Sequence, residues 1–176
     1  MPATKRLNLT AYIRDIPDFP TKGILFRDIT PLLQHGPAFR QAIRMLAERY
    51  RGTRPDAVVA IESRGLIVGA ALAYELGVGV VPVRKKGKLP HKTYRAHYTL
   101  EYGKDTLEIH QDGLKKGARV LLVDDLLATG GTMGATIQLI EQCGGRILEL
   151  AFLIELTALK GRERVAPHPV RSLVQY

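Results

Sequence analysis

The stretch Val120-Leu121-Leu122-Val123-Asp124-Asp125-Leu126-Leu127-Ala128-Thr129-Gly130-Gly131-Thr132 decides the fold of this chain. Its first four residues are apolar, which predicts a strand buried on both faces of a parallel sheet. Two aspartates follow at the carboxyl end of that strand. A glycine-rich turn and the helical run 133–142 come next. Backbone N–H groups therefore gather at a helix N-terminus, where the helix dipole favours an anion.

The side chains of this stretch predict a site for a phosphorylated sugar. The glycine pair allows positive φ and close approach of a ligand to the backbone, and the threonines beside it add hydroxyl donors for phosphate oxygens. Asp124 and Asp125 repel a phosphate, so sugar hydroxyls or a magnesium-bound group are better partners. The alternative is a tight turn with two solvated aspartates, which leaves acids beside a buried strand without partners. The stretch lacks the glycine and lysine spacing of a P-loop and of a dinucleotide-binding turn.

These thirteen residues resemble the signature of the type I phosphoribosyltransferases, which bind 5-phosphoribosyl-1-diphosphate (PRPP). The resemblance implies that Asp124 and Asp125 hold the ribose hydroxyls. It also implies that the loop after them holds the 5-phosphate. The residues of that loop are Ala128, Thr129, Gly130, Gly131 and Thr132.

Length and composition are those of an ordinary globular domain. The chain has 176 residues, enough for one domain (1–176) with a proper core. No apolar run reaches the roughly 18 residues of a membrane span, and the N-terminus lacks the apolar core of a signal peptide. The single cysteine, Cys143, excludes an internal disulfide and suits a reducing cytosol, so we expect a cytoplasmic protein.

The net charge of +9 leaves a nucleic-acid-binding function open. The basic residues are spread along the chain, however, and cluster mainly in 84–88. A small anionic substrate explains such a local cluster equally well, and no zinc-ligand spacing or aromatic RNA-binding motif accompanies it. We therefore expect neither a nucleic acid nor a membrane as a partner.

Strand-like and helix-like segments alternate along the chain, which predicts an α/β fold. Its centre is a twisted, mostly parallel sheet flanked by helices. In such a sheet the turns after Ile61, Val83 and Val123 converge at one edge, where ligands bind. Strands are expected at 56–61, 78–83, 120–123, 146–156 and 172–175, helices at 10–16, 38–50, 66–76 and 133–142, and a polar connection at 160–164.

Two segments fall outside this alternation. Residues 84–108 form a long, polar and basic connection, which is typical of a flexible lid or binding loop. Its last part, 106–110, returns as a strand and gives a hairpin-like arm. The other segment, 1–35, precedes the sheet, and two prolines and a glycine within 17–23 predict an ordered but irregular loop there. The family resemblance implies that this segment forms an N-terminal hood.

The tetrapeptide Glu62-Ser63-Arg64-Gly65 is, on its own, compatible with an ordinary strand-to-helix turn. Beside the signature it resembles the family's pyrophosphate loop, which implies that Arg64 forks onto diphosphate oxygens while Ser63 and Gly65 offer backbone amides. Such loops carry unusual backbone, so we expect one near Ser63 and Arg64. The resemblance also assigns to the diphosphate three lid residues, some of them acting across a dimer interface: Arg84, Lys85 and Lys88.

The hood narrows the resemblance to the adenine phosphoribosyltransferases. Phe26 offers a stacking face for a flat base, or is simply a core residue. The resemblance implies that Leu25 supplies backbone contacts to adenine and that Arg27 points toward the base or toward a phosphate. The segments that carry the resemblance are Asp18-Phe19-Pro20, Phe26-Arg27-Asp28-Ile29-Thr30-Pro31, 84–90, Leu100-Glu101-Tyr102-Gly103 and Glu155-Leu156-Thr157.

The catalytic residues implied by the resemblance are Arg64, Glu101 and Tyr102. A carboxyl group on the lid can manage the proton of the base as a general acid or base, and Tyr102 can donate a hydrogen bond. Without the resemblance, Glu101 is an ordinary solvated acid in a loop. The histidines show no metal-ligand spacing.

The implied reaction is purine salvage: adenine and PRPP give AMP and pyrophosphate through an oxocarbenium-like transition state. Mg²⁺ is expected on substrate oxygens and waters, with at most a water-mediated contact to Asp124 and no direct protein ligand. A homodimer is implied as well. Two alternatives stay open: a PRPP-sensing regulator that binds nucleic acid, and a related transferase for hypoxanthine, guanine, xanthine or orotate, since a fold does not fix the base.

Overall fold

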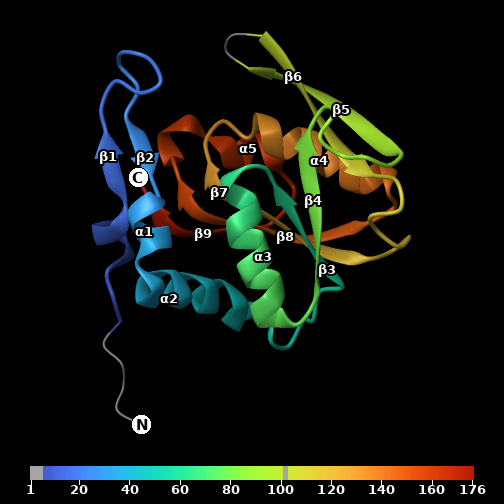
Figure 1. Ribbon diagram of the computed structural model, residues 1–176, viewed down its shortest axis with the longest axis horizontal. Coiled ribbons are helices and arrows are strands. Elements are labelled where there is room, and N and C mark those ends of the chain that lie inside the picture. The colour runs from blue at the N-terminus through green and yellow to red at the C-terminus, as the bar shows by residue number, and fades with distance from the viewer. Residues whose placement is uncertain (1–5, 101–102) are drawn as a thin grey trace.

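The centre of the fold is a seven-stranded sheet (Figure 1). The computed structural model describes residues 6–100 and 103–176. From one edge to the other, its strands are β5 (Thr93–Leu100), β6 (Gly103–His110), β4 (Gly79–Lys85), β3 (Ala57–Ile61), β7 (Arg119–Leu127), β8 (Arg146–Glu155) and β9 (Val170–Gln175). Neighbours from β4 to β9 are parallel, whereas β6 pairs antiparallel with both β4 and β5. The predicted, mostly parallel sheet is confirmed.

Helices cover both faces of this sheet. Along β7, Leu121 and Val123 pack into one core cluster and Val120 and Leu122 into the other, because successive side chains of a strand point to opposite faces. All four are fully buried, as the apolar run predicts. In the described residues no helix is long and apolar enough to cross a membrane. The helices are α1 (Thr30–Gln34), α2 (Gly36–Ala47), α3 (Arg64–Leu76), α4 (Gly131–Gln142) and α5 (Gly161–Val165), with single turns η1 (Leu9–Tyr12), η2 (Glu48–Tyr50) and η3 (Thr157–Leu159).

The N-terminal segment carries a small sheet of its own, at the blue side of Figure 1. Strands β1 (Arg14–Ile16) and β2 (Phe26–Asp28) pair antiparallel. The helix expected over 10–16 is therefore wrong: only η1 forms there, started by the Asn8 side chain, and the backbone of 14–16 bonds to β2 instead. The polar loop between the strands is confirmed as irregular.

The segment 84–108, expected to be a long loop, is largely a regular β-hairpin; the expected return strand over 106–110 and the hairpin-like arm are confirmed. Strands β5 and β6 are paired in register from Thr93↔His110 to Leu100↔Gly103, and β6 extends the central sheet through Arg84↔Glu108. The hairpin is held because alternate residues (Ala96, Leu107 and Ile109) are buried in the core cluster shared with α4. Figure 1 shows this arm reaching out from the sheet edge beside α4.

Two further boundaries differ from the expectation. Strand β7 continues to Leu127, because its last residues pair with β8 (Asp124↔Phe152 and Leu126↔Ile154). The two aspartates thus lie within the strand and not after it. The polar connection expected at 160–164 is the short helix α5.

Candidate active site

The signature stretch builds a cavity of about 200 Å³ at the carboxyl ends of β3 and β7. We call this cavity the cup; it is lined by Arg64, by residues 124–133 and by Phe152. Its floor is the phosphate loop, residues 128–132, which runs into α4. Gly130 has a φ of +80° and no side chain caps the helix, so the first amides of α4 are free of side-chain partners. Gly131 is already the first helical residue. This geometry suits an anion.

The two aspartates form the wall of the cup. Asp124 Oδ1 accepts a hydrogen bond from the Asp125 backbone N–H at 2.9 Å. Burial and the charge of Asp125 raise the pKa of Asp124 well above its usual range. Asp125 is 6% exposed, and its Oδ2 lies 2.8 Å from Arg64 Nε without the geometry of a hydrogen bond. Buried acceptors with unused capacity fit hydroxyl donors such as those of a sugar.

The turn after β3 brings the expected pyrophosphate residues to the same end of the sheet, at the carboxyl ends of the parallel strands. Helix α3 begins at Arg64, and the peptide bond between Glu62 and Ser63 is cis. The expected unusual backbone is confirmed, one residue earlier than predicted. Gly65 lies directly against Asp124, since a Cβ at position 65 would overlap Asp124 Oδ1. The turns after β3 and β7 therefore meet, and Arg84 at the end of β4 joins them through its hydrogen bond to Glu62, as the sheet topology predicted.

Two of the expected lid cations are already engaged. Arg84 Nε donates to Glu62 at 2.7 Å, and the Lys85 backbone N–H donates to the same carboxylate at 2.8 Å. The Lys85 ammonium lies 3.1 Å from Asp105. The backbone carbonyl of Lys88 accepts a hydrogen bond from Arg84 at 3.3 Å. The sequence had not singled out Glu62 as the group that positions these cations.

Tyr98 is a second residue that the sequence did not single out. Tyr98 lies on strand β5 of the arm, and its hydroxyl donates a hydrogen bond of 3.2 Å to Asp105 on strand β6. Burial, the nearby Asp105 and the charge of Asp124 raise the pKa of Tyr98 to about 12, and a hydrogen bond with Thr132 acts in the opposite direction. Tyr98 and Gly131 line the same groove, so the Tyr98 side chain lies beside the phosphate loop. Glu101 and Tyr102, expected to be catalytic, lie outside the described residues.

The hood brings one of its three expected residues to the cup. The Phe26 ring lies 4.9 Å from the Arg64 guanidinium and contacts Phe19 edge-on. Leu25 is 45% exposed beside it. Arg27, on the opposite side of β2, pairs with Asp15 and stacks 3.7 Å from the Tyr176 ring. Its guanidinium is thus occupied, and a contact to the base stays a prediction.

Helix α5 supports the phosphate loop from outside. Gly161 fits against it so closely that a Cβ there would overlap the carbonyl oxygen of Ala128. The next residue, Arg162, holds the buried Glu155 at the end of β8 by two hydrogen bonds of 2.6 and 2.7 Å. Ser172 on β9 also donates to Glu155. We call these contacts among Arg162, Glu155 and Ser172 the clamp. The clamp holds α5 against the ends of β8 and β9, on the outer side of the phosphate loop.

A cup of this kind in an α/β sheet defines a class of protein. The family model of the phosphoribosyl transferase domain matches residues 30–174. The chain belongs to the phosphoribosyltransferase family.

Full-length relatives define the branch. The chain is 58% identical to the adenine phosphoribosyltransferase of Roseiflexus castenholzii, over 97% of this chain and 99% of the relative. The crystal structure of the enzyme from Thermoanaerobacter pseudethanolicus superposes with a TM-score of 0.93 at 51% identity, covering 96% and 98% of the two chains. That of Saccharomyces cerevisiae, complexed with D-2,5-dideoxy-2,5-imino-altritol 1,6-bisphosphate and adenine, gives 0.89 at 41% identity over 94% and 96%. Within its family, the chain is one of the adenine phosphoribosyltransferases.

Proposed function

We infer that the protein transfers the 5-phosphoribosyl group of PRPP to adenine and so produces AMP and pyrophosphate. The observation that carries this function is the cup, in which paired aspartates, an uncapped helix N-terminus and Arg64 face one cavity. The full-length similarity to adenine phosphoribosyltransferases supports the choice of base. The reaction is a step of purine salvage.

In this function the cup positions the sugar. The Asp124 and Asp125 carboxylates accept hydrogen bonds from the ribose 2- and 3-hydroxyls. The 5-phosphate binds to the amides and hydroxyls of the phosphate loop: Ala128, Thr129, Gly130, Gly131 and Thr132. Holding the sugar at both ends fixes C1, and such positioning removes much of the entropic part of the barrier.

The diphosphate leaves from C1 as positive charge develops on the ribose ring. Arg64 and the amides of Ser63 and Gly65 bind the leaving group, and Arg84, Lys85 and Lys88 add positive charge. Cations fixed in advance stabilise the charge that develops in the transition state. Because Glu62 and Asp105 already hold Arg84 and Lys85, these side chains reach the diphosphate with little freedom to lose.

Adenine lies between the hood and the arm. Phe26 stacks on its face, Leu25 contacts its edge through the backbone, and Arg27 supports the hood from behind through Asp15 and Tyr176. We assign proton transfer at the base to Glu101 and a hydrogen bond to Tyr102, on the arm that closes over the ribose.

Mg²⁺ is the proposed cofactor. The described residues contain no group of three acids or histidines that could cage a metal ion. The adjacent Asp124 and Asp125 carboxylates suit an ion that would arrive with the diphosphate and meet Asp124 through water. When bound, the ion neutralises the leaving diphosphate.

We also propose that the protein is a cytoplasmic homodimer. Ile67 and Tyr74 are two helical turns apart on α3, and they are 48% and 88% exposed. Val80 on the neighbouring β4 is 42% exposed. Large apolar side chains on one exposed face suit a second subunit. Light scattering of the purified protein, which measures its mass in solution, tests the homodimer.

The experiment that tests the function is a panel of bases assayed with PRPP and Mg²⁺. We expect turnover of adenine, with hypoxanthine, guanine, xanthine and orotate slower by several orders of magnitude. Omission of Mg²⁺ should abolish turnover. Preference for another base would overturn the assignment of adenine but not the role of the cup.

A further inference from the structure

The phosphate loop is short of positive charge. Residues 128–132 include no lysine or arginine, and the acids beside the loop are Asp124 and Asp125. Arg64, the cation in the cup, is already within 2.8 Å of Asp125. A phosphate monoester carries about −1.5 to −2 charges at pH 7, whereas the helix dipole supplies only about half a charge. A further cation is needed on the open side of the phosphate.

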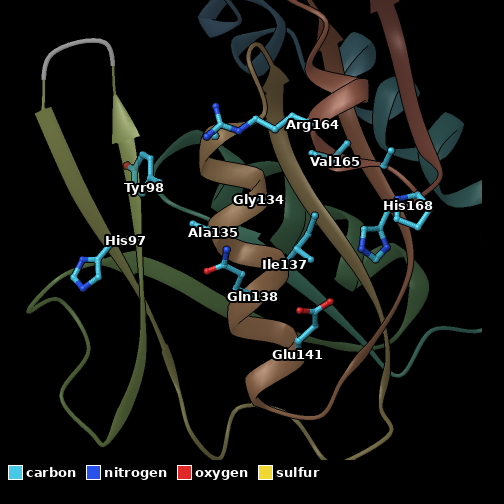
Figure 2. Close-up of a pocket in the computed structure, with 13 residues that line it drawn as sticks. His97, Tyr98, Gly134, Ala135, Ile137, Gln138, Glu141, Arg164, Val165 and His168 are labelled. Atoms are coloured by element: carbon cyan, nitrogen blue, oxygen red, sulfur yellow. The ribbon is translucent and has the colours of Figure 1, made fainter.

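Arg164 stands at that position. A Cβ built on Gly130 would lie 3.3 Å from the Arg164 Cβ, so the side chain starts at the wall of the phosphate loop. Figure 2 shows it crossing the N-terminal end of α4, with its guanidinium on the side of Tyr98. No carboxylate of residues 6–100 or 103–176 forms an ion pair with it.

The neighbouring arginine shows the contrast. Arg162 is bound on both sides of its guanidinium, to Glu155 and to the Val170 carbonyl. Residues two apart on a helix do not share a face. The same short helix therefore uses Arg162 to anchor itself and presents Arg164 toward the ligand side.

The space around Arg164 is open to a phosphate. A groove of about 450 Å³ runs along α4 between the arm and the segment after α5, and Gly131 lines both this groove and the cup (Figure 2). We propose that Arg164 is a substrate-binding residue that contacts the 5-phosphate of PRPP and of AMP from the side of this groove. The proposal rests on the proposed function, and it adds a binding residue to it.

The test compares Arg164→Gln with Lys115→Gln. The second variant removes a charge of the same sign at the opposite end of the sheet, away from the cup. Lys115 lies between β6 and β7, beside the amino ends of the parallel strands. In Arg164→Gln, the KM for PRPP and the Kd for AMP from calorimetry should both rise about tenfold, the loss of one charged hydrogen bond. The KM for adenine and kcat should stay within about twofold of the parent. Arg164→Lys should recover part of the affinity.

Two results would overturn the proposal. One is an Arg164→Gln variant whose Kd for AMP stays within about twofold of the parent. The other is an equal loss in Lys115→Gln, which means a general effect of net charge. A parent protein that fails to convert adenine and PRPP refutes the proposed function instead, so the two failures are distinguishable.

Discussion

The cup and the two segments that flank it, the hood and the arm, are built in different ways. The cup comes from one continuous stretch and one turn, and its wall is buried: Asp125 is 6% exposed. The flanks are two separate segments at the borders of the sheet, the hood within 1–35 and the arm of β5 and β6, and Leu25 on the hood is 45% exposed. The difference assigns a fixed, preformed site to the phosphoribosyl group and an exposed, adaptable surface to the base. The predictions below test that division.

Removing the acids of the cup should have the largest effect. In Asp124→Asn with Asp125→Asn, kcat/KM for PRPP should fall about a thousandfold, because the site loses the negative charge of the pair and two carboxyl acceptors for the ribose hydroxyls, each worth about 1.5–3 kcal/mol. The fold should survive, since burial raises the pKa of Asp124 and an amide relieves that unfavourable charge. Steady-state kinetics measure kcat/KM, and a thermal melt shows whether the variant is folded. A variant as active as the parent contradicts the role of the acids.

Filling the contact between the turn and the wall should have the next largest effect. In Gly65→Ala the new Cβ would lie 3.1 Å from the Asp124 Cα and displace its carboxylate. We expect about a hundredfold lower kcat/KM for PRPP and a stability loss of about 1–3 kcal/mol. Gly52→Ala is the matched control, because nothing lies within 4 Å of that position. Equal behaviour of the two variants would show that the cup tolerates movement of its wall.

Weakening the clamp outside the cup should mainly affect stability. Glu155→Gln removes the charged acceptor of two Arg162 hydrogen bonds and should cost about 1–2 kcal/mol in a denaturant titration, because the Arg162 side chain is partly solvated. The pKa of Glu155 is lowered, chiefly by the hydrogen bonds from Arg162. The contribution of the ionised Glu155 to the free energy of unfolding is therefore fully present above the unfolded pKa of about 4.3. It is lost as the pH falls through the lower folded pKa.

The control for the clamp is Glu163→Gln, at an exposed acid on the same helix. It should leave the free energy of unfolding unchanged. If the difference between parent and Glu155→Gln does not shrink as the pH is lowered below about 4, the stabilisation does not come from the ionised pair.

A change on the arm should have the smallest effect. Tyr98→Phe removes the hydrogen bond to Asp105, which also holds Lys85. We expect kcat to fall about threefold to tenfold, the worth of one hydrogen bond, with the KM for adenine nearly unchanged. Tyr94→Phe, on the same face of β5, is the control. A larger loss than for Gly65→Ala would mean that the arm, not the cup, dominates.

The sequence predicted the cup well because its signals are local. A strand, two acids and a glycine turn stand next to each other, so the order of residues already gives their positions. The convergence of the three turns followed from sheet topology, whereas the unusual backbone near Ser63 followed only from the resemblance of residues 62–65 to the family's pyrophosphate loop. The end of β7 was misplaced, because its pairing with β8 overrides the polar character of Asp124 and Asp125.

The flanks were less predictable because their structure depends on distant partners. The return strand over 106–110 was expected, whereas β5 was not, because Ala96 packs in the core cluster shared with α4, a contact that no local pattern shows. The helix expected at 10–16 gave way to pairing with β2. Arg27 and Glu62 received their partners from segments 12 to 149 residues away, so their roles could be seen only in the folded chain.

The most direct test of the cup is a crystal structure of the protein with AMP. The account predicts the phosphorus atom within the phosphate loop, the ribose hydroxyls on Asp124 and Asp125, and the adenine ring on Phe26. A nucleotide phosphate bound anywhere else would contradict it.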